Sequence, residues 1–140
     1  LPSLTRQLPF DPVKSFTPIT LVGITPFILV VRADSPARSV ADYVALAKAK
    51  PGSVTYGSAG IGTPLHFGGE VMKALTGIDI VHVPYKGGAP VIAALLSGEL
   101  TSSFAPATIA IPQVKAGKLR ALGNLGSVRT TAMPDLPNIG

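Results

Sequence analysis

The sequence has 140 residues, of which 46% are hydrophobic and 14% charged, so it predicts one globular domain rather than two domains or a disordered chain. It contains no cysteine, which excludes disulfides, thiol catalysis and cysteine-ligated metals, and no apolar run approaches the ~18 residues that span a membrane. The net charge of +5 suits an anionic partner, but no basic, aromatic-rich run indicates nucleic-acid binding.

The first 20 residues are interrupted by prolines and lack regular periodicity, which predicts an extended connector leading into the domain. The chain begins at Leu1 without an initiator Met or a signal peptide, so we expect a mature or excised piece of a longer protein. The tail around residues 133–137 is again irregular.

Between these ends, short apolar runs alternate with helical patterns of about ten residues. The apolar runs predict five strands, at residues 27–31, 54–56, 80–83, 100–104 and 119–122, although Thr101-Ser102-Ser103 makes the fourth unusually polar. Helices are predicted from Ser39 to a stop at Pro51-Gly52, over 64–76, over 90–97, and over 109–116 with a break at Pro112. This alternation predicts an α/β fold with a mostly parallel sheet of about five strands and helices on both faces.

The second predicted strand ends in a glycine-rich run, Tyr56-Gly57-Ser58-Ala59-Gly60-Ile61-Gly62-Thr63-Pro64-Leu65-His66. Its glycines allow a sharp bend and a close approach of the backbone to a ligand. Thr63 is expected to cap the following helix, and Pro64 to take its first position. Such a helix start presents unpaired N–H groups and a partial positive charge, which suit a carboxylate or a phosphate.

The spacing within this run argues against nucleotides. Gly57 and Gly62 have the spacing of a phosphate-binding P-loop, but Thr63 stands where that motif needs lysine. Leu65 stands where a dinucleotide fingerprint needs its third glycine. A small carboxylate is therefore the better match.

The two histidines do not indicate catalysis. His66 lies in the first turn of the predicted helix, where it either donates to a ligand or ties down the loop, and His82 is expected to be a hydrogen-bonded histidine within a strand. Ser58 and His66 lack an orienting third group and the nucleophile-elbow pattern, and no paired carboxylates suit acid–base chemistry. We therefore expect no catalytic residue, no bound metal and no cofactor.

A second loop, Val83-Pro84-Tyr85-Lys86-Gly87-Gly88-Ala89-Pro90, follows the third predicted strand. Ligands of parallel sheets bind beyond the carboxyl ends of the strands, where this loop, the glycine-rich loop and residues 105–108 are expected to lie. Tyr85 and Lys86 are thereby placed at the rim of a crevice. Lys86 is either a ligand contact or a solvated charge.

Together these motifs resemble those of the tripartite tricarboxylate transporter receptors, the TctC or Bug family of periplasmic solute-binding proteins. The matching segments occur in the family's order, at residues 8–19, 56–66, 81–87, 115–122 and 134–137. The resemblance implies one lobe of a type II periplasmic binding protein, or Venus flytrap. Residues 1–20 would then connect from a missing first domain. Residues 21–127 would form the ligand-binding second domain, with hinges near 18–26 and 121–127, and residues 128–140 would return toward the first domain.

The resemblance also implies that a small carboxylate is captured between two domains and delivered to a membrane permease, without catalysis, nucleic-acid binding or membrane insertion. The residues implied to face the ligand are Thr25, Ser58, Ala59, Gly60, Gly62, Thr63, His66, Tyr85, Lys86 and Ala105. Many relatives have an aspartate in place of Ala105, and its absence here favours a carboxylate without an amine. An enzyme acting on a small anion and a sensory binding module are the alternatives.

Overall fold

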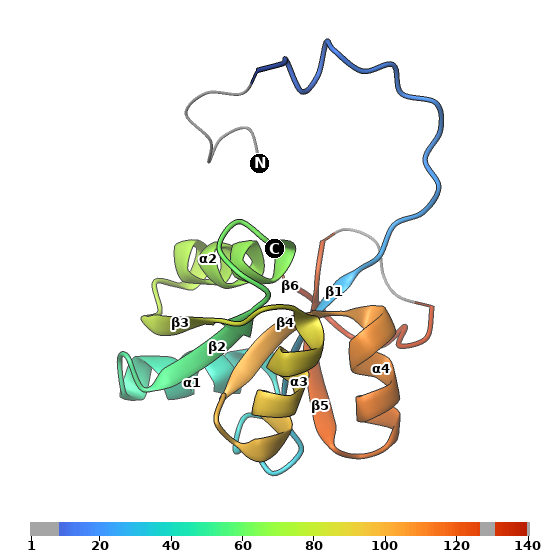
Figure 1. Ribbon diagram of the computed structural model, residues 1–140. Helices are drawn as coiled ribbons and strands as arrows, with labels where there is room; N and C mark the ends of the chain where they lie inside the picture. Colours follow the sequence, from blue (N-terminus) through green and yellow to red (C-terminus); the bar gives the residue numbers. More distant parts are fainter. Residues whose placement is uncertain (1–8, 127–130, 140) are drawn as a thin grey trace.

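The computed structural model describes residues 9–126 and 131–139, which form a sheet flanked by helices (Figure 1). Within these residues the strands are β1 (Phe27–Arg32), β2 (Val54–Ser58), β3 (Ile80–Pro84), β4 (Ser102–Pro106), β5 (Leu119–Leu125) and β6 (Asn138–Ile139). The helices are α1 (Val40–Ala49), α2 (Pro64–Thr76), α3 (Gly88–Ser97) and α4 (Ala107–Lys115). The predicted α/β alternation is confirmed.

The order of the strands across the sheet is β3-β2-β4-β1-β5-β6. β2 pairs in parallel with β3 and β4, and β5 pairs in parallel with β6, whereas β1 is antiparallel to both of its neighbours, β4 and β5. All of these strands except β1 therefore run in one direction, which confirms the prediction of a mostly parallel sheet. Because β1 runs the other way, its first residue, Phe27, pairs with Pro106 at the end of β4.

Helices cover both faces of the sheet, as the sequence predicts (Figure 1). On one face, Tyr43 of α1 and Met72 of α2 pack with Leu29 of β1. On the other face, Leu95 of α3 belongs to the same core cluster as Ile28 of β1. Neighbouring side chains of a strand point to opposite faces, so β1 is buried on both sides, which explains its continuous apolar sequence.

The boundaries of α1 and α2 match the sequence prediction closely. The side chain of Ser39 caps α1 by accepting a hydrogen bond from the N–H of Asp42 at 3.1 Å. α2 begins at Pro64 and is followed by Gly77, whose φ of 67° closes the helix in the left-handed conformation that favours glycine. These signals are local in sequence, and they are sufficient where no tertiary contact competes with them.

The boundaries of α3 and α4 differ from the prediction. α3 begins at Gly88, two residues before Pro90, because Gly87 makes the preceding turn with a φ of 128°. α4 begins at Ala107 and continues through Pro112 to Lys115, so the predicted break is wrong. A proline within a helix removes one backbone hydrogen bond, and in α4 the flanking turns remain helical.

The polar fourth strand is formed by later residues than predicted, at Ser102–Pro106 instead of 100–104. Its two buried serine hydroxyls are both hydrogen-bonded. Ser102 Oγ donates to the carbonyl oxygen of Thr55 at 3.0 Å and lies 2.8 Å from the hydroxyl of Tyr43. Ser103 Oγ donates to the carbonyl oxygen of Gly57 at 3.1 Å. Because these partners come from β2 and α1, the sequence around the serines does not predict them. Polar residues therefore occupy a central strand without leaving an unpaired group.

The C-terminal end of the described chain adds a strand where the sequence predicts irregular structure. β5 extends three residues beyond its predicted end, to Leu125, and β6 pairs with this extension in parallel. The side-chain amide of Asn124 donates to Oδ1 of Asn138 at 3.1 Å across the pair. A strand of two residues is too short to show any periodicity, which is why the sequence does not reveal it.

Residues 9–26 contain no helix or strand and are mostly exposed, and Figure 1 shows them extending away from the sheet. The limits of the connector, the ligand-binding domain, the two hinges and the return segment stay predictions, and residues 1–8, 127–130 and 140 lie outside the described residues. The longest described helix, α2, has 13 residues, and none of the described helices is long and apolar enough to cross a bilayer.

Candidate functional site

The carboxyl ends of β2, β3 and β4 lie at one edge of the sheet, as the sequence predicts. Ser58 pairs with Pro84 at the ends of β2 and β3, so the two loops that follow start side by side. The N–H of Tyr85 donates to the carbonyl oxygen of Ser58 at 2.8 Å and joins these loops. The start of β1 reaches the same edge, where the N–H of Ala107 donates to the carbonyl oxygen of Pro26 at 2.9 Å.

The glycine-rich loop, residues 58–63, is held in shape by its own hydrogen bonds. Oγ of the fully buried Ser58 lies 3.1 Å from both the N–H nitrogen and the carbonyl oxygen of Gly60. The same carbonyl oxygen accepts a hydrogen bond from Oγ1 of Thr63 at 2.7 Å. Gly60 and Gly62 have φ values of 123° and 81°, so both bends favour glycine. These hydrogen bonds and backbone conformations fix the path of the loop.

Gly57 serves a different purpose from the one predicted. It lies within β2, not at a bend, and its φ is not in the left-handed region. A Cβ atom at this position would overlap the side chains of Leu100 and Val91. The missing side chain therefore lets α3 and the segment before β4 pack closely on β2, and it does not bring the backbone toward a ligand.

The first turn of α2 has backbone N–H groups without an acceptor in the described part of the chain. Thr63 takes the N-cap position as predicted, but its side chain makes no capping hydrogen bond, so the predicted side-chain cap is wrong. Pro64 has no N–H, and the N–H groups of Leu65 and His66 have no hydrogen-bond acceptor in the described part of the chain. Two amides and the positive end of the helix dipole are thus left for an external anion.

The two histidines lie against each other and hold both ends of the glycine-rich loop. Their ring centroids are 4.4 Å apart. Nδ1 of His66 accepts a hydrogen bond from the N–H of Gly62 at 3.2 Å, so His66 ties down the loop, which is one of the two roles left open by the sequence. Nε2 of His82 lies 2.6 Å from Oγ of Ser58, which confirms His82 as a hydrogen-bonded strand histidine.

The charges around the histidines come from α2. Oε1 of Glu70 accepts hydrogen bonds from the Tyr56 hydroxyl at 2.8 Å and from Nζ of Lys73 at 3.0 Å, and it lies 3.9 Å from Nε2 of His66. The Tyr56 hydrogen bond, with a smaller contribution from Lys73, lowers the pKa of Glu70. Burial lowers the pKa of His82, and the nearby His66 lowers it further. The His82 imidazole is therefore neutral near neutral pH.

The side chains of Tyr85 and Lys86, both predicted at the rim of the crevice, have different surroundings. The side chain of Lys86 is exposed beyond the end of β3. The hydroxyl of Tyr85 donates to Oε1 of Glu99 at 2.6 Å, and Glu99 follows the last turn of α3. The Tyr85 ring thus extends toward the far end of α3, and only its backbone contributes to the edge of the sheet. Its hydrogen bond to Glu99 raises the pKa of the Tyr85 hydroxyl.

The remaining predicted site residues are Thr25, Ala59 and Ala105. Thr25 is exposed just before β1, and Ala59 is half-buried in the glycine-rich loop. Ala105 lies within β4, where it pairs with Ile28 of β1. It is only 1% exposed and packs in the core beneath α3 and α4. The expected loop at residues 105–108 is therefore wrong, because β4 runs directly into α4 at this point.

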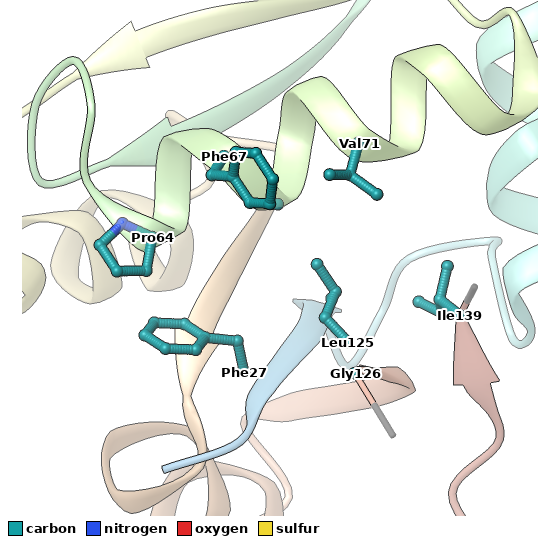
Figure 2. Close-up of a pocket in the computed structure, with 8 residues that line it drawn as sticks. Phe27, Pro64, Phe67, Val71, Leu125, Gly126 and Ile139 are labelled. Atoms are coloured by element: carbon teal, nitrogen blue, oxygen red, sulfur yellow. The ribbon is translucent and has the colours of Figure 1, made fainter. Parts of the chain in front are cut away.

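An apolar hollow of about 380 Å³ adjoins the start of α2, and the sequence does not predict it. Figure 2 shows side chains from α2 lining one side of it and the ends of β1, β5 and β6 lying opposite. The lining residues are Phe27, Pro64, Phe67, Gly68, Val71, Leu125, Gly126 and Ile139. Pro64, Phe67 and Val71 have the spacing of residues on one face of a helix, which could have indicated this hollow. An apolar helix face usually indicates core packing, however, so the sequence alone does not reveal it.

The geometry does not favour catalysis. Ser58 pairs with His82 instead of His66, at a distance typical of a nucleophile and its base. Ser58 is completely buried, however, and no carboxylate orients His82 among the described residues. Residues 9–126 and 131–139 also contain no group of three His, Asp or Glu side chains that could hold a metal ion. The pair therefore holds a loop in place.

Comparisons with known proteins point to one family. Residues 1–140 match the tripartite tricarboxylate transporter family receptor, TctC. The chain is 36% identical over 135 residues to a UPF0065 protein of Bordetella pertussis, and 39% identical over 135 residues to a UPF0065 protein of Cupriavidus necator. The alignments cover 96% of this chain but 42% and 41% of these relatives, so the chain spans about two fifths of their length.

Solved structures agree with this match. Rpa4515 of R. palustris, solved with adipate, is 32% identical and superposes with a TM-score of 0.85 over 96% of this chain and 45% of its own. MatC from Rhodopseudomonas palustris, solved with bound malate, is 25% identical, with a TM-score of 0.84 over 97% of this chain and 46% of its own. The motifs, the fold and these relatives agree, and the chain belongs to the tripartite tricarboxylate transporter receptor family.

Proposed function

We propose that this chain is the solute-binding lobe of a periplasmic receptor that captures a small carboxylate and presents it to a membrane permease of the tripartite tricarboxylate type. The observation that carries the proposal is the open start of α2, where the N–H groups of Leu65 and His66 have no acceptor in the described part of the chain. Membership of the receptor family supports it, as do the similar proteins that were solved with adipate and malate.

The proposed binding chemistry uses the backbone. A carboxylate has two oxygen atoms with several lone pairs, so it can accept both amides of the first turn while the helix dipole attracts its charge. The hydrogen bonds of Ser58 and Thr63 already fix the adjoining loop, so little conformational entropy is lost when a solute binds. Lys86 and the net charge of +5 attract anions toward the sheet edge.

The site on this chain is open on one side. The chain spans about two fifths of its relatives, and we propose that a second lobe closes over the start of α2 and excludes water from the bound solute. Exclusion of water strengthens the interaction between the carboxylate and the helix start, because the local dielectric constant falls. Such closure supports reversible capture of the solute without its chemical conversion.

An NMR titration tests the proposal directly. Adipate and malate are added to the ¹⁵N-labelled 140-residue chain, and dimethyl adipate serves as a control with the same carbon chain and no charge. We expect saturable shifts of the Gly60, Gly62, Leu65 and His66 amides with at least one acid and none with the ester. The start of α1, which Ser39 caps, is the internal control. Equal shifts with acid and ester, or shifts confined to other amides, would contradict the proposal.

A further inference from the structure

The chain has two histidines, and both are bonded to the glycine-rich loop, residues 58–63. His66 comes from α2 and His82 from β3, yet their rings touch, with centroids 4.4 Å apart. One bonds the backbone near the end of the loop, at Gly62, and the other bonds the side chain at its beginning, Ser58. The loop that borders the proposed carboxylate site is therefore held by two imidazole groups, and an imidazole loses its acceptor nitrogen when it takes up a proton.

The hydrogen bond from the N–H of Gly62 to Nδ1 of His66 can form only while the His66 ring is neutral. The N–H of Gly62 is the donor, so Nδ1 of His66 must present its lone pair, and the proton of the neutral ring lies on Nε2. An imidazolium carries protons on both nitrogens and accepts nothing. Protonation of His66 therefore breaks this bond and places two N–H groups face to face at the end of the loop.

The bond from His82 to Ser58 responds differently. Nε2 of His82 can accept from the serine hydroxyl or donate to it, so the 2.6 Å contact survives protonation by a rotation of the hydroxyl. A charge on His82 instead acts on His66, because two imidazolium rings at this separation repel each other. A proton on one ring therefore opposes a proton on the other, and the pair takes up one proton before a second.

We propose that His66 and His82 are positioning residues of the glycine-rich loop, and that uptake of a proton by this pair releases the loop from its binding-ready shape. The polar and charged groups around the two histidine rings are Glu70 and Lys73 from α2 and Tyr56 and Ser58 from β2. Among these groups Glu70 is the only anion, and it lies 3.9 Å from Nε2 of His66. The cluster therefore accommodates one added proton far better than two.

The consequence for binding rests on the proposed function. If the loop and the start of α2 hold a carboxylate, acidification weakens that binding although the added charge is positive, because Gly62 no longer keeps its orientation. The affinity for adipate then falls by up to about tenfold per pH unit over the range in which the pair takes up one proton. A simple gain of positive charge would have the opposite effect and strengthen binding.

The test follows the loop itself and needs no solute. Amide spectra of the ¹⁵N-labelled 140-residue chain are recorded from about pH 8 to about pH 5, together with the imidazole signals of both histidines. We expect the Gly62 amide to shift together with the His66 ring, and its protection from hydrogen exchange, relative to an unstructured amide at the same pH, to decrease as the pH falls. A Gly62 amide that does not change over this range would overturn the proposal.

Two substitutions of His66 make the test two-sided. In His66→Asn, the side-chain oxygen takes the place of Nδ1 and does not titrate, so the Gly62 amide should keep its high-pH position at every pH. In His66→Phe, no acceptor is present, so the same amide should keep its low-pH position. If Gly62 still titrates in His66→Asn, the His66 ring is not the cause and the proposal fails.

The third variant separates the two rings. His82→Gln keeps a hydrogen-bonding group near Ser58 but removes the second ring, so the Gly62 amide should still change together with the His66 ring as the pH falls; a Gly62 transition that disappears in this variant would show that His82, and not His66, causes it. The His66→Asn/His82→Gln double variant has no histidine, and any residual titration belongs to the α-amino group. Missing carboxylate shifts at pH 8 would overturn the proposed function alone, because the loop transition is measured without solute.

Discussion

The hydroxyl of Thr63 donates to the carbonyl oxygen of Gly60 at 2.7 Å, and it thereby leaves the first turn of α2 without a side-chain cap. A threonine at this position normally accepts a hydrogen bond from the helix, which contributes about 1 kcal/mol. Here the same side chain stabilises the loop before the helix. The amides of Leu65 and His66 consequently stay available, which is the feature on which the proposed carboxylate site depends.

Replacement of Thr63 by valine should loosen the loop and leave the helix start unchanged. Thr63→Val removes the hydroxyl while keeping the branched shape, and we expect the free energy of unfolding to fall by about 1 kcal/mol. Hydrogen exchange at Gly62 should accelerate, whereas exchange within α2 should not. Urea denaturation and amide exchange measure these effects.

Thr63→Ser is the matched control, because it keeps the hydroxyl that bonds to Gly60. It should retain most of the loop protection that valine removes. Equal behaviour of the serine and valine variants would show that the hydroxyl does not hold the loop. A loss of protection throughout the first turn of α2 in Thr63→Val alone would show that the hydroxyl caps the helix in solution.

Gly69 lies where the structure leaves no space for a side chain. It lies in α2 against the ring of Tyr56, and a Cβ atom would overlap that ring. The ring cannot move easily, because it is fully buried and stacks on His82 with centroids 5.1 Å apart. Gly69→Ala should therefore destabilise the fold by about 1–3 kcal/mol, although alanine favours helices.

Gly88→Ala is the control for this overpacking effect. Gly88 is also helical, but the nearest atom to the added methyl group would be Cδ1 of Ile109 at 3.5 Å, an ordinary contact. This variant should unfold at the same or a higher temperature than the parent chain. If Gly69→Ala matched Gly88→Ala in thermal denaturation, the packing of α2 on Tyr56 would be looser than the structure indicates.

The fold was largely predictable because it depends on periodicity and on local stop signals. The continuous apolar run of β1 and the glycine after α2 are such signals, and both elements lie where they were expected. The parallel arrangement of β2 and β3 then dictates that their following loops share an edge. These features need no knowledge of any particular side-chain partner.

The parts that could not be predicted depend on contacts between distant residues. Ser58 and His82 meet because β2 and β3 are neighbouring strands in which His82 lies opposite Tyr56, two residues before Ser58, and 24 positions separate Ser58 from His82 in the sequence. Thr63 has two acceptable hydrogen-bonding roles, and its sequence neighbours do not decide between them. The apolar hollow beside Phe67 exists only because the ends of β1, β5 and β6 lie opposite α2.

The buried pair of Tyr43 and Ser102 should respond asymmetrically to substitution. Ser102→Ala leaves the Tyr43 hydroxyl, which lies 2.8 Å from Ser102 Oγ, buried without this partner. Tyr43→Phe leaves Ser102 with its second partner, the carbonyl oxygen of Thr55 at 3.0 Å. Because an unpaired buried polar group costs about 1–3 kcal/mol, Ser102→Ala should be the more destabilising change.

A double-mutant cycle measures this pair. The Tyr43→Phe/Ser102→Ala variant should be more stable than the sum of the two single effects implies, since no hydroxyl is then left unpaired. Urea denaturation of the four proteins gives the coupling free energy. Strict additivity, or a larger loss in Tyr43→Phe than in Ser102→Ala, would contradict the arrangement of hydrogen bonds in this part of the core.

The stability of the fold should depend on pH through His82. Burial and the nearby His66 lower the pKa of His82 below its ordinary value of 6.5, so the unfolded chain binds a proton at a pH where folded His82 does not. Below pH 6.5 the folded state should therefore lose stability as the pH falls, and this loss should continue until the lowered pKa is reached. Above pH 6.5, His82 should cause no further change.

Urea denaturation at about pH 8, 6.5 and 5 measures this effect, because the carboxyl groups with lowered pKa values, such as Glu70, titrate mainly below this range. His82→Gln cannot bind a proton, so its stability should depend less on pH between the two lower values. The parent chain and the variant should differ most at the lowest pH, where only the parent loses stability through His82. If the free energy of unfolding depended on pH in the same way in both proteins, His82 would have the same pKa in the folded and the unfolded chain. That result would contradict the lowered pKa of His82.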